Sequence, residues 1–254
     1  MYGFTDGGGV RVTDRSRDEY AEFLSARRAQ LLERMSSAAA RSGRDANDIT
    51  LLAVSKTVGN EEVELAYAAG YRAFGENRPQ ELKRKVTAVR LNPELAGVRF
   101  DMIGNLQKNK INQVLGNAEL VHSVSSVHLA EAIAQRANAQ GIEVPCLLEV
   151  NVSGEASKSG LSVAEARPAV DAIMGLEGIS LKGLMTMAPA NNPDVARRTF
   201  CGLRELCEEL RSYSGLALPV LSCGMSGDFE IAIEEGSTLV RLGRIVFDPA
   251  YECV

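Results

Sequence analysis

Lys56 is the residue of this sequence whose type and position could do chemistry most directly. It ends the segment ITLLAVSK (residues 49–56), in which a short apolar run stops at Ser55. A run too short for a helix and bounded by polar residues is typical of a strand buried on both faces. A lysine at the rim of such a core loses its proton more readily than one in water, because desolvation disfavours the ammonium. The neutral amine could attack a carbonyl and form a Schiff base. Alternatively, Lys56 is a solvated lysine at a strand end.

A second segment with chemical potential is GMSGD (residues 224–228), which follows another short apolar run. Its two glycines permit close approach of the backbone, Ser226 offers a hydroxyl, and Asp228 could cap a helix beginning at the next residue. Gly243 follows the next apolar run along the chain. In α/β barrels the loops after the last two strands often hold a phosphate through backbone N–H groups, so these segments predict an anion site. A tight turn with a helix cap is the alternative.

Arg241 lies inside that last apolar run, between Val240 and Leu242. Alternation along a strand leaves its direction open. Facing inward, its guanidinium would be a fixed positive charge that could hydrogen-bond a ring nitrogen or an anion; facing outward, it would be an ordinary surface arginine. A lysine, a phosphate site and an inward arginine together suit pyridoxal 5′-phosphate, with its aldehyde on Lys56 and its ring nitrogen at Arg241. An arginine partner leaves that nitrogen unprotonated, which makes the ring a weaker electron sink.

The elements that must position these residues form a repeat of short apolar runs and amphipathic stretches. Strands that alternate with helices predict right-handed crossovers and a parallel sheet, and eight such units predict closure into a (β/α)₈ TIM barrel. An open doubly wound sheet usually carries GxGxxG after its first strand, where this chain has SKTVGN. The expected strands are ITLLAV (49–54), YRAF (71–74), VRFDMIG (98–104), ELVHSV (119–124), CLLEVNV (146–152), LKGLMTM (181–187), VLSCG (220–224) and TLVRLG (238–243).

Helical periodicity predicts a leading helix at residues 17–42 and a helix after most strands. We expect a flexible tail at residues 1–16, which contain three consecutive glycines, and one barrel at residues 17–254. The helices expected between strands are residues 61–69, 79–89, 108–115, 127–140, 163–174, 193–213 and 229–235. Active sites of such barrels lie at the carboxyl ends of the strands, where Lys56, Arg241 and the glycine-containing loops fall.

Composition excludes several other classes of protein. Apolar residues make up 45% and charged residues 24%, and the net charge of −5 does not indicate a nucleic-acid or membrane binder. The five cysteines form no CxxC pair, which argues against a disulfide framework and favours a cytoplasmic protein. The two histidines, His122 and His128, lack metal-ligand spacing, so we expect no metal.

Several longer motifs resemble the YggS/PROSC family of pyridoxal-phosphate-binding proteins, also called pyridoxal phosphate homeostasis proteins. They occur in the family's order across nearly all of residues 17–248. The motifs are LLAVSK (51–56), FGENRPQEL (74–82), IGNLQKNK (103–110), HSV (122–124), LLEVNVSGEASKSGL (147–161), LKGLMTMAP (181–189) and LSCGMSGDFEIAIEEGSTLVRLG (221–243).

The resemblance implies a barrel similar to the N-terminal domain of alanine racemases, with pyridoxal 5′-phosphate on Lys56. It also implies that Asn77 lies near the cofactor ring and Arg241 at the ring nitrogen. Around the phosphate it implies Ser226, Gly243 and the backbone of Arg244. Two residues depart from the family pattern: Asn105 stands where the family often has histidine, and Arg244 stands where a small hydroxyl residue is common.

The function that these residues favour is binding of the cofactor with little or no turnover, as a carrier or buffer in vitamin B6 homeostasis. A two-base racemase needs a second acid/base opposite the lysine. Alanine racemases resemble this chain only over the barrel and supply that tyrosine from a further β-domain, whereas this chain ends soon after the eighth run. The alternatives are a racemase-like enzyme with Cys223 or His122 as second base, and a cofactor-free aldolase that uses Lys56. We expect a monomer, with apo-forms of pyridoxal-phosphate enzymes as its partners.

Overall fold

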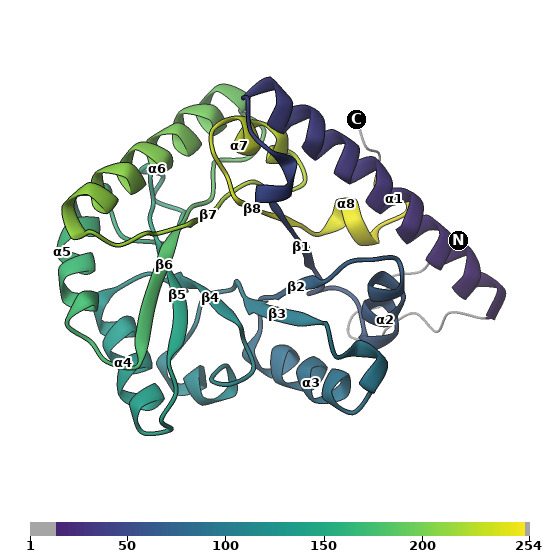
Figure 1. The fold of residues 1–254 in the computed structure, drawn as a ribbon, viewed down its shortest axis with the longest axis horizontal. Coiled ribbons are helices and arrows are strands. Elements are labelled where there is room, and N and C mark those ends of the chain that lie inside the picture. The colour runs from purple at the N-terminus through teal and green to yellow at the C-terminus, as the bar shows by residue number, and fades with distance from the viewer. Residues whose placement is uncertain (1–13, 252–254) are drawn as a thin grey trace.

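Eight parallel strands close into a barrel in the computed structural model, which describes residues 14–251. Each strand pairs with its neighbours in sequence, and β1 also pairs with β8, so the described sheet has no open edge. The predicted (β/α)₈ barrel is therefore confirmed (Figure 1). The strands are β1 (Thr50–Val54), β2 (Ala73–Glu76), β3 (Arg99–Met102), β4 (Leu120–Val124), β5 (Val144–Glu149), β6 (Ile179–Met185), β7 (Val220–Ser222) and β8 (Leu239–Leu242).

Helices connect the strands and surround the barrel (Figure 1). The α-helices are α1 (Asp14–Arg41), α2 (Asn60–Ala68), α3 (Pro79–Arg90), α4 (Val127–Asn138), α5 (Val163–Met174), α6 (Pro193–Ser214), α7 (Phe229–Glu234) and α8 (Arg244–Phe247). Three short 3₁₀ helices are η1 (Ala46–Asp48), η2 (Pro93–Leu95) and η3 (Lys108–Gln113).

Two helix predictions need correction, and one helix was not predicted. The helix expected at residues 108–115 is only the 3₁₀ helix η3, because Ile111 is its single buried residue and a helix gains most of its stability from an apolar face. The short helix α8 was not predicted. Helix α1 begins at Asp14, earlier than expected, and the rest of the tail expected at residues 1–16 lies outside the described residues.

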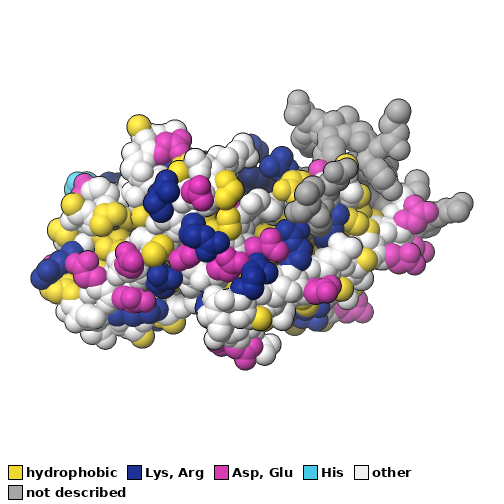
Figure 2. All heavy atoms as spheres, turned by 90° about the horizontal axis from the view of Figure 1, so that it is seen from above, with side chains coloured by type: hydrophobic (Ala, Val, Ile, Leu, Met, Phe, Trp, Pro, Cys, Tyr) yellow, Lys and Arg dark blue, Asp and Glu magenta, His cyan; other side chains and the backbone are white. Residues whose placement is uncertain are grey.

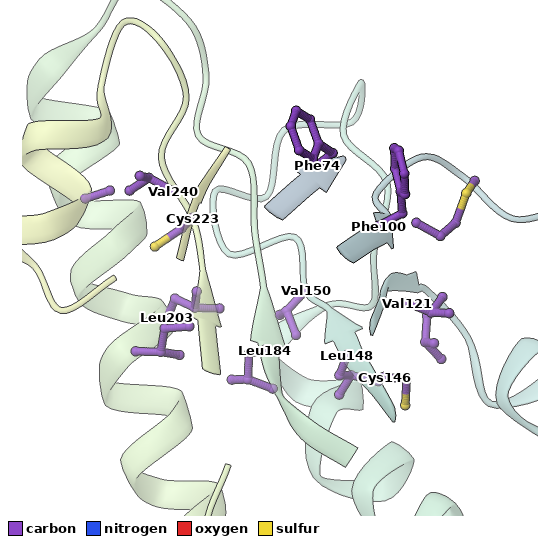
Figure 3. Close-up of a cluster of buried hydrophobic side chains, with 14 of the residues drawn as sticks. Phe74, Phe100, Val121, Cys146, Leu148, Val150, Leu184, Leu203, Cys223 and Val240 are labelled. Carbon is purple, nitrogen blue, oxygen red and sulfur yellow. The ribbon is translucent and has the colours of Figure 1, made fainter. Parts of the chain in front are cut away.

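The strands bury both faces, as their apolar runs predicted. Side chains directed away from the barrel axis form the large core between the sheet and the helices, which includes Phe74, Leu148 and Val240 (Figure 3). Side chains directed inward form two smaller clusters, one around Leu52 and Leu239 and one around Leu120, Leu147 and Met185. Inward positions nearer the carboxyl ends are polar, and these residues build the candidate site.

Helix α1 covers the seam where β8 meets β1, and it packs against α7, α2 and α8 (Figure 1). Two of its side chains donate hydrogen bonds to backbone carbonyls of α8. Arg27 Nη1 donates to the carbonyl of Ile245 at 2.6 Å, and the Tyr20 hydroxyl donates to the carbonyl of Phe247 at 2.8 Å. The first helix therefore fixes the position of α8, next to the candidate site.

The surface of the described residues mixes charges of both signs. On the face in Figure 2 the lysine and arginine side chains alternate with aspartate and glutamate side chains. Within residues 14–251, no helix combines the length and the apolar character that crossing a membrane requires. The same residues include no group of three or more His, Cys, Asp and Glu side chains arranged to hold a metal ion.

Candidate functional site

Lys56 lies at the carboxyl end of the barrel, in the turn that follows β1. Ser55 before it is fully buried, whereas Lys56 itself is exposed. The expectation that the protein desolvates this amine is therefore wrong for the side chain as it stands, because the buried part of the strand ends one residue earlier. What the fold does provide is a fixed backbone, since the Ser55 N–H donates to the carbonyl of Gly75 on the neighbouring β2 at 3.0 Å.

Asn77 follows β2 directly and is half-buried at the same rim. The loop after β3 approaches it closely at Gly104. A Cβ atom on Gly104 would lie 2.2 Å from the Asn77 carbonyl oxygen, so this position has room only for glycine. Asn105, the next residue, is exposed. The close approach fixes the backbone of Asn77 beside the turn that carries Lys56.

Arg241 faces the inside of the barrel, which resolves the direction that the sequence left open. Its side chain is 6% exposed, and it donates through Nη1 to the Ser222 hydroxyl at 2.6 Å and through Nη2 to the Thr186 carbonyl at 3.0 Å. Burial lowers the pKa of this guanidinium, an effect that the nearby Cys223, Asp228 and Glu149 oppose. Since a guanidinium has five N–H donors and only two are used, others remain for a ligand.

A chain of hydrogen bonds continues from Arg241 through the barrel interior. Ser222 Oγ lies 2.9 Å from His122 Nδ1, and His122 Nε2 lies 3.1 Å from Asp101 Oδ2. Asp101 Oδ2 also accepts from Arg99 Nη2 at 2.8 Å. Burial lowers the pKa of the His122 imidazole, although its hydrogen bond to Asp101 acts in the opposite direction. A neutral ring that donates from Nε2 to the carboxylate and accepts from Ser222 at Nδ1 satisfies both contacts.

The segment after β7 forms a tight turn, which the sequence allowed with or without a bound anion. Gly224 has φ of +93°, and a Cβ there would lie 2.6 Å from the Ala232 Cβ, so glycine is required. Asp228 does not cap α7 as expected. Its Oδ1 instead accepts from the Met225 N–H at 2.6 Å, which closes the turn upon itself. Burial raises the pKa of this carboxyl, while that hydrogen bond and Arg241 oppose the rise.

The loops after β7 and β8 lie against each other. The Ile245 N–H in the first turn of α8 points to the Ser226 hydroxyl at 3.5 Å. Gly243 precedes α8 and lies beside β1, because a Cβ on it would be 3.5 Å from the Val54 Cβ. Arg244 is exposed, and its guanidinium lies over the ring of Tyr251 at 5.5 Å. Of the predicted residues, Ser226, Gly243 and Arg244 are therefore brought together next to β1, the strand that precedes Lys56.

The two other residues considered as acid/bases lie away from this rim. Cys223 points into the core between the sheet and the helices (Figure 3), and burial raises the pKa of its thiol to about 11. His122 has no exposed surface and both of its ring nitrogens are engaged. Glu149 is buried on the inner side of β5, where burial raises the pKa of its carboxyl and Arg241 opposes this.

A cavity of about 340 Å³ lies at the opposite, amino-terminal end of the barrel. It contains none of the predicted site residues. Its lining comes from strand starts and the turns before them: Asp48, Thr50, Arg99, Glu119, Leu120, Lys182, Pro219, Val220, Thr238 and Leu239. Because catalytic and binding groups of such barrels gather at the carboxyl ends, the position of Lys56 and not this cavity defines the candidate site.

Sequence reasoning assigned no role to four polar residues that support the site. Asp101 is fully buried behind His122, and Ser222 joins that histidine to Arg241. Glu76 and Lys85 form a buried ion pair beneath Lys56, with Nζ and Oε1 2.5 Å apart. The signal available for Asp101 and Ser222 was a polar residue at an inward strand position. Glu76 lies on the outer face of β2, where it meets Lys85, and Lys85 gave no signal, because it lies in a helix rich in charged residues.

Most of the chain is similar in sequence to known proteins. Residues 28–249 match the protein family described as the alanine racemase N-terminal domain. The chain is 40% identical over 222 residues to the pyridoxal phosphate homeostasis protein of Aquifex aeolicus, which covers 87% of this chain and 96% of that protein.

Two solved structures are also similar to most of this chain. PipY of Synechococcus elongatus, with pyridoxal phosphate bound, is 30% identical and has a TM-score of 0.77, covering 88% of this chain and 99% of PipY. An unknown protein from Bifidobacterium adolescentis is 40% identical with a TM-score of 0.86, covering 94% of this chain and 98% of that protein.

Proposed function

The chain belongs to the family of pyridoxal phosphate homeostasis proteins, within the wider family of the alanine racemase N-terminal domain, and on this premise we propose that it binds pyridoxal 5′-phosphate covalently through Lys56. In this proposal the protein acts in intracellular vitamin B6 homeostasis, in the cytoplasm, as a carrier or buffer with little or no turnover. The cofactor would supply an aldehyde for the covalent bond and a ring that withdraws electrons.

The observation that carries the proposal is that the turn with Lys56 adjoins the loops after β7 and β8. These two loops, residues 224–228 and 243–245, are the proposed anion cradle. Lys56 lies in the turn after β1, β1 pairs with β8, and the loop after β8 lies against the loop after β7. Gly243 lies beside Val54, two residues before the lysine. An amine and a phosphate site on neighbouring strands match a small molecule with an aldehyde at one end and a phosphate at the other.

The residues present fit this group. The Lys56 Nζ, once neutral, would attack the aldehyde carbon, form a C=N bond and release water. Ser226 and the N–H of Ile245 would donate to phosphate oxygens. Arg241 has free donors for the ring nitrogen, and a guanidinium stays protonated, so that nitrogen would remain an acceptor and the ring a weak electron sink.

The same geometry favours a carrier over a racemase-like enzyme. A second base must reach the reacting carbon from the side opposite Lys56. Cys223 lies in the outer core with a raised thiol pKa, and His122 is enclosed by Asp101 and Ser222. Neither side chain therefore supports the racemase alternative.

Spectroscopy and trapping test the proposal together. Pyridoxal 5′-phosphate added to the purified chain is expected to give a visible absorbance band, and borohydride reduction is expected to fix its mass on the peptide that contains Lys56. Both signals should vanish in Lys56→Ala and persist in Lys83→Ala, which removes an exposed lysine of α3. A colourless wild-type protein that takes up no cofactor would refute the proposal. Exchange of amino-acid α-protons at ordinary enzymatic rates would refute the carrier role.

We further propose that the protein is a monomer and that apo-forms of pyridoxal-phosphate enzymes receive its cofactor. The exposure of Lys56 supports exchange with such partners, because water and other amines can reach the bond. Light scattering should give the mass of one chain. The loaded protein should restore the activity of an apo-enzyme, and failure to do so would leave a buffer as its role.

A further inference from the structure

A charged pair is buried directly beneath the rim that carries Lys56. Glu76 is the last residue of β2 and Lys85 lies in α3, and their side chains are 0% and 2% exposed. Two charges removed from water lose much of their hydration energy. Apolar residues of similar volume in place of such a pair often leave a protein equally stable or more stable. The position of this pair is thus better explained by what it contacts than by stability alone.

Both charged groups contact Ser55. Lys85 Nζ donates to the Ser55 carbonyl oxygen at 2.6 Å and to Glu76 Oε1 at 2.5 Å. The Ser55 hydroxyl donates to the same Glu76 oxygen at 2.6 Å. Three hydrogen bonds therefore close a ring that joins the end of β1, the end of β2 and the first turns of α3.

This ring holds the residues immediately before two predicted cofactor residues. The Ser55 carbonyl belongs to the peptide bond that leads into Lys56, and Glu76 leads into Asn77. A fixed peptide bond at each place limits where the following side chains can point. This restraint matters most for Lys56, because its own side chain is exposed and long.

We propose that Lys85 is a positioning residue for Lys56. Its ammonium, held by Glu76, fixes the Ser55–Lys56 peptide bond so that the amine of Lys56 is directed toward the anion cradle. This inference rests on the proposed function, since the group being positioned is the amine that would bind the cofactor. Groups that orient metal ligands change affinity about 10–100-fold when removed, and we expect an effect of similar size here.

The alternative is that the pair only stabilises the fold, and a double variant separates the two roles. Lys85→Met alone leaves Glu76 as an uncompensated buried charge, which destabilises any protein. Lys85→Met combined with Glu76→Gln removes both charges at similar volume, so stability is largely retained. The Ser55 carbonyl nevertheless loses its ammonium donor in this double variant. Lys83→Met, at an exposed position of the same helix, is the matched control.

The experiment compares the wild-type chain, the double variant and the control without added cofactor and during titration with pyridoxal 5′-phosphate. Urea midpoints report the fold; the visible band and the reduced mass on Lys56 report binding. We expect the double variant to unfold near the wild-type midpoint, to bind at least tenfold more weakly and to show a shifted band, while Lys83→Met matches the wild type. Equal affinity and an unchanged band in the folded double variant would overturn the inference.

Two further results would also decide the inference. If the double variant does not fold, Ser55→Ala decides, because it removes the hydroxyl contact to Glu76 and a long contact to the Gly75 carbonyl while both charges stay paired. Weaker binding by the folded variant supports the inference, and unchanged binding overturns it. If the wild-type chain itself forms no adduct on Lys56, the proposed function fails and the inference fails with it. A wild-type adduct with unchanged affinity in the variants overturns the inference alone.

Discussion

Replacement of His122 by glutamine is expected to flatten the dependence of stability on pH. The imidazole is fully buried, 3.1 Å from Asp101 and 2.9 Å from Ser222, and burial lowers its pKa below 6.5. The unfolded chain therefore takes up this proton at a higher pH than the folded chain. Stability linked to His122 is complete above the unfolded pKa and is lost as the pH falls below it.

The size of this change in stability follows from the uptake of one proton by the unfolded chain. A single proton bound only in the unfolded state changes the free energy of unfolding by about 1.4 kcal/mol per pH unit, at pH values well below the pKa of the group in the unfolded chain. Between about pH 7.5 and 5.5 His122 should thus remove up to about 1.4 kcal/mol. Glu149 acts in the opposite sense, because burial raises its pKa and the folded state binds that proton more readily. Only the difference between matched variants isolates the histidine.

The assay is urea unfolding of the chain without cofactor at several pH values. His122→Gln keeps an amide N–H that can donate to Asp101, and its slope with pH should be shallower than that of the wild type. His128→Gln is the control, since the His128 side chain is 83% exposed. The reasoning is refuted if His122→Gln keeps the wild-type slope or if His128→Gln alone flattens it.

Three other perturbations have clear expectations. Gly224→Ala should lower the free energy of unfolding by about 1–3 kcal/mol, because φ is +93° and the new Cβ would clash with Ala232. Gly227→Ala is the control and should lower it by well under about 1 kcal/mol, because no atom lies within 4 Å of its Cβ position. Urea unfolding compares the two variants. Under iodoacetamide, the half-buried Cys201 should be alkylated before Cys223, whose thiol pKa is about 11; peptide masses give the order, and early labelling of Cys223 would contradict its burial. Arg27→Met should destabilise the fold by about 1–3 kcal/mol in thermal unfolding, because two backbone carbonyls near the end of the barrel lose their donor.

The barrel was predictable because its signal is local. Each strand is buried on both faces, so it appears as an apolar run, and the crossover rule then leaves few topologies. The ends of the runs were less reliable. The second strand was expected at residues 71–74, but β2 extends through Gly75 and Glu76. The charge of Glu76 suggested a strand end, whereas it is buried against Lys85 from the next helix.

The site was predictable only where one segment carried the signal. Lys56 and the turn at Gly224 were identified from their own neighbours in sequence. The direction of Arg241 was not, because it depends on two distant partners, Ser222 in β7 and Thr186 just after β6. His122 likewise joins groups that lie far apart in the chain. Such contacts exist only after the barrel closes, so no local pattern encodes them.

The bonds of α1 to the far end of the chain have a consequence for biosynthesis. The hydroxyl of Tyr20 and the guanidinium of Arg27 find their acceptors only when Phe247 and Ile245 have been made. Until then the ribosome carries a helix whose apolar stripe has no permanent cover, and closure of the barrel must wait until α8 has been translated. The interval between the first helix and the last is therefore the period in which the nascent chain most needs protection from aggregation.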